Sequence, residues 1–98
     1  MTILLAVTVP VEIAHRGVNE IMHGHSLTLE VWTDRSVDLD AFVADVKEAV
    51  AHIDHGPLED TIGARTFEDV AAAVARCTQA KRVVVRLPTK GYVIDLTI

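Results

Sequence analysis

The sequence predicts a single α+β domain spanning residues 1–98, with a four-stranded antiparallel sheet that carries two helices on one face. Segments in which apolar and polar residues alternate occur at both ends of the chain, and this alternation is typical of half-buried strands. Two segments with a helical spacing of apolar residues lie between them. The resulting order, ββααββ, groups the strands together, which favours an antiparallel sheet with both helices on one side.

The first two strands are expected over residues 3–15 and 23–33. Pro10 has no N–H to donate, so this part of the first strand is predicted to lie at a sheet edge or a bulge. Trp32 falls on the polar face of the second strand, which indicates that this face is also partly covered. The apolar positions that define the alternation are Val7, Val9, Val11 and Ile13 in the first strand and Leu27, Leu29 and Val31 in the second.

Two amphipathic helices are expected next in the chain. The first covers residues 38–53 and ends before residues 56–57, a Gly-Pro pair that interrupts the pattern. The second begins after Thr66, a good N-cap residue, with Asp69 at the capping-box position. Its apolar stripe consists of Phe67, Val70, Ala71, Val74 and Cys77, so Cys77 is predicted to be a buried structural thiol.

The chain ends in a predicted hairpin. Residues 83–85 are three consecutive valines, a β-branched run that requires burial. Residues 89–91, Thr-Lys-Gly, form the expected turn. Apolar residues then alternate again from Tyr92 to Ile98, which predicts the fourth strand.

The composition argues against two classes of partner. The net charge is −5 and no run of Lys or Arg stands out, which argues against a nucleic-acid surface. No apolar stretch approaches the roughly 20 residues that a membrane-spanning helix needs, so no membrane association is expected. The single cysteine cannot form an internal disulfide and the first residues read directly into a strand, so a cytoplasmic location is expected.

Three histidines fall in the same phase as the apolar faces of the first two strands. His23 and His25 are two residues apart, so their side chains lie on one face of the second strand. His15 ends the first strand in the matching phase, and a hairpin that pairs the two strands would bring all three rings together. Three imidazoles with an open fourth position form a zinc site. The alternative is that these are ordinary surface histidines at a strand end.

The order of four motifs extends this interpretation. The sequence contains His15, then His23-Gly24-His25, then Asp54-His55, then residues 66–71 with the sequence Thr-Phe-Glu-Asp-Val-Ala. With this set the chain resembles the 6-pyruvoyl tetrahydropterin synthase family, which includes the 6-carboxytetrahydropterin synthases of queuosine biosynthesis. The resemblance covers nearly the whole chain. It implies the tunnelling fold, in which subunits associate through their sheets into a trimeric barrel that is often doubled to a hexamer.

The resemblance also implies roles for individual residues. His15, His23 and His25 match the zinc ligands of the family. Asp54 and His55 match the pair that relays protons, in which the carboxylate orients the imidazole. From the residues alone, the same pair could instead belong to a helix C-cap region.

A Thr-x-Glu element opens the second helix. The resemblance implies that Thr66 and Glu68 bind substrate, with Thr66 as a contact to a pterin.

The chain departs from the family pattern in three places. Asn19 stands where the family has a catalytic cysteine, and Leu87 stands where our alignment puts the glutamate that anchors the pterin. The loop at residues 17–22 is shorter than in the family. Glu20 could replace the missing thiolate as a base, and a solvated loop glutamate is the alternative.

These observations lead to three hypotheses. The first is a zinc-dependent lyase-type enzyme, homologous to 6-pyruvoyl tetrahydropterin synthase, that acts on a pterin-like or related small heterocyclic substrate. Authentic 6-pyruvoyl tetrahydropterin synthesis is not expected, because the family cysteine and glutamate are absent. The second is a non-catalytic, zinc-bearing oligomer that binds a pterin or a partner protein. The third is a structural assembly protein without a metal.

Overall fold

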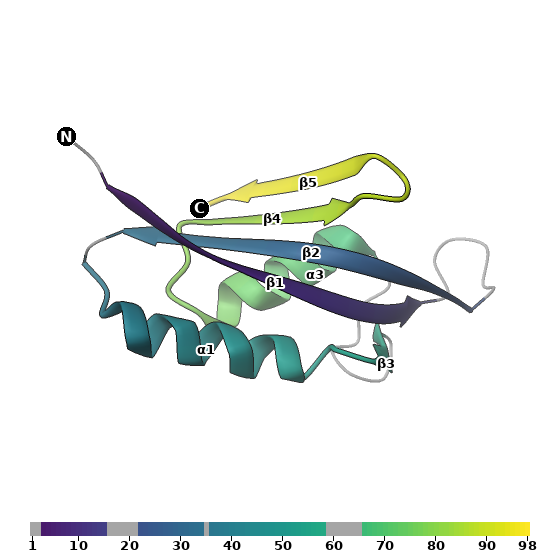
Figure 1. The fold of residues 1–98 in the computed structure, drawn as a ribbon, viewed down its shortest axis with the longest axis horizontal. Helices are drawn as coiled ribbons and strands as arrows, with labels where there is room; N and C mark the ends of the chain where they lie inside the picture. The colour runs from purple at the N-terminus through teal and green to yellow at the C-terminus, as the bar shows by residue number, and fades with distance from the viewer. Residues whose placement is uncertain (1–2, 16–21, 35, 59–65) are drawn as a thin grey trace.

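The computed structural model describes residues 3–15, 22–34, 36–58 and 66–98. It contains a five-stranded sheet in the order β3-β1-β2-β4-β5, with both helices on one face (Figure 1). The elements are β1 Leu4–His15, β2 His23–Asp34, α1 Leu39–Ala51, β3 Gly56–Pro57, α3 Phe67–Cys77, β4 Arg82–Leu87 and β5 Tyr92–Thr97. The expected antiparallel sheet of four strands and its two helices are confirmed. The short β3, which runs parallel to β1, was not expected.

The longest pairing in the sheet joins β1 to β2. These two strands are antiparallel over twelve residues each, from Leu4 opposite Asp34 to His15 opposite His23. Odd-numbered residues of both strands face the helices, and the inward side chains of Val11 and Leu29 are completely or almost completely buried. The alternation of residues in the sequence therefore corresponds to side chains that point alternately into the core and away from it.

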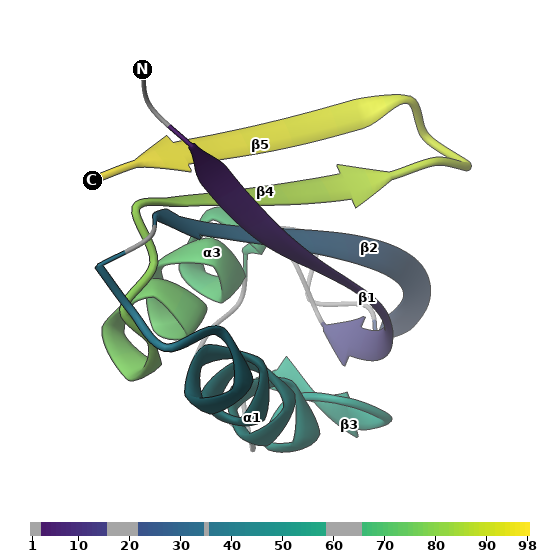
Figure 2. The same cartoon turned by 60° about the vertical axis from the view of Figure 1, so that its left-hand side comes forward.

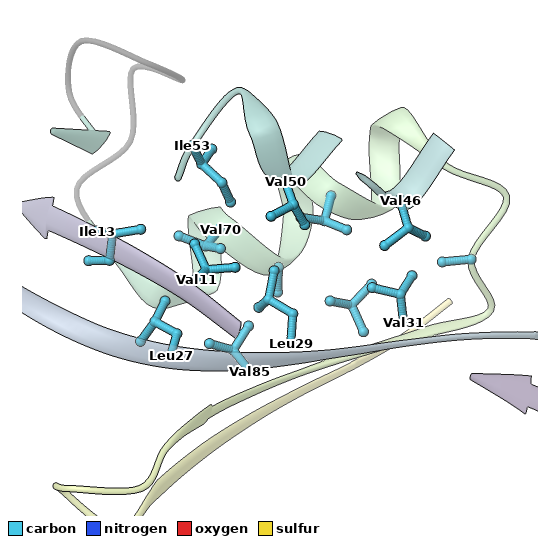
Figure 3. Close-up of a cluster of buried hydrophobic side chains, with 14 of the residues drawn as sticks. Val11, Ile13, Leu27, Leu29, Val31, Val46, Val50, Ile53, Val70 and Val85 are labelled. Carbon is cyan, nitrogen blue, oxygen red and sulfur yellow. The ribbon is translucent and has the colours of Figure 1, made fainter. Parts of the chain in front are cut away.

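The core lies between the sheet and the two helices, as Figure 2 shows from the side. Helix α1 packs against β1, and α3 packs against β4 and β5. Aliphatic side chains from both layers interdigitate in this space (Figure 3). Those labelled in the figure are Val11, Ile13, Leu27, Leu29, Val31, Val46, Val50, Ile53, Val70 and Val85. Burial of this set provides the main driving force for folding.

Both helices begin with the expected type of cap. Asp38 is the N-cap of α1, and its Oδ2 accepts a hydrogen bond of 3.3 Å from the backbone N–H of Ala41. Thr66 is the N-cap of α3, and its Oγ1 accepts one of 3.2 Å from Asp69 N–H. Each cap satisfies one amide that the helix itself leaves without a partner.

Most of β1 forms an open edge of the described sheet. Strand β3 pairs only with Ile13 and Ala14, so the preceding part of β1 has no described strand on its outer side. The amide of Glu12 points to this side, because it donates to Asp54 next to β3. By the alternation of a strand, the amide positions of Thr8 and Pro10 point the same way. Pro10 therefore lies at an edge and costs no hydrogen bond to β2, as the sequence predicted.

The face of the sheet opposite the helices carries charged pairs over an apolar centre. Arg82 binds both carboxylate oxygens of Asp95, at 2.9 and 2.7 Å, and its guanidinium lies 5.7 Å from the centre of the Trp32 ring. Arg86 forms a second ion pair with Glu30. These long side chains help to cover this face, which agrees with the partial cover inferred from the position of Trp32.

The prediction that Cys77 is buried was wrong. Its side chain is exposed, although it is in phase with the buried Val70 and Val74 on α3. Helix α3 ends at Cys77 and the next residue, Thr78, is extended, so no further helical turn shields the thiol. Helical periodicity gives the face on which a residue lies but not how far the covering layer extends.

Within the described residues, none of the helices is both long and apolar enough to span a membrane.

The cap of α1 provides a test of the fold. We expect Asp38→Ala to lower the free energy of unfolding by about 1 kcal/mol, because the Ala41 amide loses its acceptor. Asp38→Asn should keep most of the stability, since asparagine is also a strong N-cap residue. Urea denaturation of the three proteins measures the difference, and equal losses in both variants would contradict the capping role.

Candidate metal centre

The β1–β2 register brings the three predicted metal ligands together. His15 lies directly opposite His23, and His25 lies opposite Ile13, two residues earlier on β1. One ring nitrogen from each histidine lies within 4.8 Å of the others. The ring centres are 4.4 Å apart for His15 and His23, 5.0 Å for His15 and His25, and 4.8 Å for His23 and His25. We call this cluster the histidine triad.

The chemistry of the histidine triad fits a metal ion. The Nε2 atom of His25 is buried and has no hydrogen-bond partner among the described residues. Burial holds the pKa of His25 below its ordinary value, and the neighbouring rings of His15 and His23 lower it further. The neutral imidazole, which is the form that binds metals, is thereby favoured. Three nitrogens that converge and leave further positions open match a catalytic zinc site.

Phe67 forms an apolar wall beside the triad, a role that the sequence analysis missed. Its ring centre lies 4.9 Å from that of His15 and 5.1 Å from that of His25. Phe67 is the first residue of α3, directly after the N-cap Thr66, so the start of this helix is fixed next to the histidines. The signal in the sequence was the aromatic residue inside the Thr-x-Glu element. An apolar wall lowers the local dielectric constant and strengthens electrostatic interactions at the site.

Asp54 and His55 form a hydrogen-bonded pair at the edge of β1. The Nδ1 atom of His55 lies 3.0 Å from Asp54 Oδ2, and Asp54 Oδ1 accepts a hydrogen bond of 2.9 Å from Glu12 N–H. That N–H is the main reason why the pKa of Asp54 lies below its ordinary value. The backbone N–H of His55 donates to the carbonyl of Glu12. The pair is thus held by the backbone of β1.

The imidazole of His55 points away from the protein interior. Its side chain is 75% exposed, whereas those of the triad are buried or half-buried. His55 also has a positive φ of 62°, a strained backbone conformation for a residue other than glycine. The structure therefore brings Asp54 and His55 together, but it leaves His55 exposed while the triad is buried or half-buried. The backbone of Glu12 therefore positions the pair.

The remaining residues that the sequence singled out are Thr66, Glu68, Leu87, Asn19 and Glu20. Thr66 is half-buried beside Phe67, and Glu68 is exposed in the first turn of α3. Their contacts to a substrate stay a prediction. Leu87 is 1% exposed and belongs to the hydrophobic core. A buried apolar side chain therefore stands where our alignment puts the family glutamate. Asn19, Glu20 and the loop at residues 17–22 lie outside the described residues, apart from Met22.

Zinc binding tests the triad directly. After incubation with zinc and gel filtration, the protein should retain one zinc per chain, as measured by inductively coupled plasma mass spectrometry. His25→Ala should lose most of this zinc, because two imidazoles hold the ion much less tightly than three.

The matched control is His52→Ala, since His52 is an exposed histidine at the end of α1. This variant should retain zinc at the level of the unmodified protein. Equal zinc content in the two variants would show that the bound metal lies elsewhere.

Comparison with known proteins gives a fold assignment. No protein-family model matches the sequence, and a search of curated proteins finds no match. Among solved structures, the chain is similar to 6-pyruvoyl tetrahydropterin synthase from Caenorhabditis elegans. The match has a TM-score of 0.77 at 15% sequence identity and covers 100% of this chain and 96% of the other. The chain therefore has the fold of a 6-pyruvoyl tetrahydropterin synthase, as the order of its motifs predicted.

Proposed function

We propose that the protein is a zinc-dependent lyase-type enzyme, a divergent member of the 6-pyruvoyl tetrahydropterin synthase family. Its substrate would be a pterin-like or related small heterocyclic compound, and its location cytoplasmic. The observation that supports this best is the histidine triad, in which one nitrogen from each ring lies within 4.8 Å of the others. A purely structural protein of this fold would not need three buried or half-buried imidazoles next to one another.

His15, His23 and His25 would hold the zinc ion. When bound, zinc supplies a Lewis acid that polarises substrate oxygen atoms and makes neighbouring C–H or O–H protons more acidic. Phe67, whose ring lies beside those of His15 and His25, would limit access of water on one side of the triad. Thr66 and Glu68, at the start of α3, would contact the substrate next to this wall.

His55 would act as the general acid or base. Asp54 accepts the hydrogen bond of His55 Nδ1, which leaves Nε2 directed outward to take up or release a proton. Glu12 fixes Asp54 and the backbone of His55, so the imidazole is positioned before substrate arrives. Because the ring is exposed at the β1 edge, we propose that it completes a site shared between subunits.

The open edges of the sheet support self-association into a trimer or hexamer. The outer edge of β1 and the whole of β5 have unpaired sides in the described sheet. Large apolar side chains lie exposed along these edges and at their ends, and they are Ile3, Leu4, Tyr92, Val93 and Ile98. Pairing of β1 with β5 of another subunit would remove both edges at once.

Light scattering should give a mass of three or six times 10.7 kDa. The amide position of Thr8 points to the open edge, so Thr8→Pro would remove the hydrogen bond proposed to a neighbouring subunit without breaking the β1–β2 ladder. We expect Thr8→Pro to weaken assembly and Thr8→Ala to leave it intact. A protein that remains a monomer at high concentration would contradict this assembly.

The missing family residues restrict the reaction. Without a cysteine at position 19, the proton relay has no thiolate, and the buried Leu87 offers no carboxylate to the guanidine-like edge of a pterin. We therefore propose a related cleavage, such as retro-aldol release from the side chain of a dihydroneopterin, instead of 6-pyruvoyl tetrahydropterin synthesis. The apolar Leu87 also favours the second candidate function, a non-catalytic zinc-bearing binder of a pterin or a partner protein.

His55→Gly tests the catalytic role without damage to the fold. Glycine adopts a φ of 62° freely, so this variant should be as stable as the original protein or more stable by about 1 kcal/mol. The assay incubates zinc-loaded protein with 7,8-dihydroneopterin triphosphate or dihydroneopterin and follows substrate loss and released carbon fragments. Conversion should fall by about a hundredfold or more, which is the loss expected when a general acid or base is removed.

The exposed His52 again offers the control, because His52→Ala should convert substrate at the original rate. Equal conversion by His55→Gly would contradict the assigned role of His55. Stoichiometric zinc without conversion of either compound would instead favour the non-catalytic binder.

A further inference from the structure

The outer edge of β1 is closed at one point. The backbone N–H of Glu12 donates to Asp54 Oδ1 at 2.9 Å, and the carbonyl of Glu12 accepts a hydrogen bond from His55 N–H. Both edge-facing backbone groups of Glu12 are therefore used within the chain. A strand that pairs with β1 from outside can contact residues 4–11, but the pairing must end before Glu12.

Strand β5 forms the opposite open edge of the described sheet. The N–H of Ile98, just after β5, donates to the carbonyl of Lys81, just before β4, so it points inward. By the alternation of a strand, the backbone groups of Val93, Asp95 and Thr97 point to the open side. These three residues can therefore pair with the edge of another strand.

Tyr92, the first residue of β5, has its side chain on the helix side of the sheet. It pairs with Leu87 of β4, which is buried in the core, and residues directly opposite each other share a face. Tyr92 is 58% exposed and is the single tyrosine of the chain. Its ring is thus a large side chain that its own subunit does not cover.

The topology fixes the direction in which β5 of one subunit would meet β1 of the next. The pairs β1–β2, β2–β4 and β4–β5 are all antiparallel, so β5 runs opposite to β1. A closed ring relates its subunits by rotation about one axis, which preserves the direction of each strand along that axis. Pairing between subunits in such a ring is therefore antiparallel.

Two registers allow all six residues of β5 to face residues of β1. Edge-facing residues meet each other, so Val93 of the partner subunit would pair with Pro10 or with Thr8. A further shift towards the end of β1 would place Val93 at Glu12, where the edge is closed. A shift in the other direction would carry Thr97 beyond the start of β1.

Both registers bring Tyr92 of the partner subunit to the Asp54–His55 pair. Tyr92 would lie opposite Val11 in one register and opposite Val9 in the other, on the helix side of the sheet. Residues 54–55 connect α1 to β3, and Figure 2 shows these two elements on the same side of the sheet. The imidazole of His55, which is 75% exposed, and the ring of Tyr92 would meet where the partner strand ends.

We propose that Tyr92 of the partner subunit forms the wall of the site beside His55, where the partner's β5 ends against the Asp54–His55 pair. The proposal rests on the assembly proposed above and adds the residue that the second subunit contributes. The phenol ring covers the imidazole from water on one side and presents an aromatic face to a flat ring compound. Asp54 then has two roles, because it orients His55 and also ends the strand pairing that places Tyr92.

Disulfide cross-linking locates Tyr92 in the assembled protein. In a Cys77→Ser background, Tyr92→Cys is combined with Val9→Cys or with Val11→Cys, and the oxidised proteins are separated by non-reducing electrophoresis. Within one chain β1 and β5 are three strand spacings apart, about 14 Å, so any disulfide must join two subunits. We expect one of the two combinations to give covalent dimers and trimers.

The matched control combines Val11→Cys with Leu96→Cys. Leu96 lies on the same side of β5 as Tyr92, but it would face Val7 or Leu5 in the two registers. The two cysteines would then be too far apart for a disulfide, so this variant should stay uncross-linked. Equal cross-linking in the control would show that the disulfides form by random collision.

Modification by diethylpyrocarbonate tests the wall itself. In the assembled protein, His55 should react severalfold more slowly than the exposed His52, as measured by peptide mass spectrometry. Tyr92→Ala should remove this protection, whereas Tyr92→Phe should keep it, because the ring and not the hydroxyl group covers the imidazole.

Light scattering on the same samples separates this proposal from the assembly on which it rests. Two results would overturn the placement of Tyr92 and leave the assembly standing. The first is a trimer or hexamer in which neither Val9 nor Val11 cross-links to Tyr92, and the second is one in which His55 reacts as fast as His52. A protein that stays a monomer would overturn both proposals.

Discussion

The register between β1 and β2 is the constraint on which the rest of the structure depends. One pairing, with His15 opposite His23, places the aliphatic residues of both strands under the helices and the three imidazoles next to one another. A shift of a single residue along β2 would turn Leu29 and His25 to the opposite face together. Core packing therefore selects the same alignment that builds the triad. The packing of the core thus also sets the positions of the three histidines.

Two polar features of the structure are energetically unfavourable. The triad removes imidazoles from water, and burial is the largest reason for the lowered pKa of His25. A metal that binds the folded chain would offset that desolvation and stabilise the native state. His55 retains a strained backbone at a φ of 62°, held by hydrogen bonds to Glu12. Strain that is maintained at an exposed, polar position is typical of residues kept for function.

Local patterns in the sequence predicted the four longer strands, the helices α1 and α3 and the triad, because all of these follow from short repeating periods. The two-residue period assigned a face to His23 and His25, and the cap residues Asp38 and Thr66 marked the starts of the helices. Cys77 shows where this reasoning fails. A helical period gives the direction of a side chain, but its exposure depends on where the helix ends relative to the sheet.

Contacts between distant segments were not visible in the sequence. The bond from Glu12 to Asp54 spans 42 positions and uses a backbone group, which leaves no trace in residue type. The place of Phe67 against the triad depends on how α3 docks onto the sheet. Such features require the three-dimensional arrangement, because no local propensity encodes them.

X-ray absorption spectroscopy at the zinc edge tests the central claim most directly. The account predicts a first shell of light atoms at about 2.0–2.1 Å, with the multiple-scattering pattern of three imidazoles and one further oxygen or nitrogen. A sulfur neighbour at about 2.3 Å would place the metal at the exposed Cys77, and a shell without imidazole scattering would place it on surface oxygens. Either result would contradict a metal centre built on the β1–β2 register.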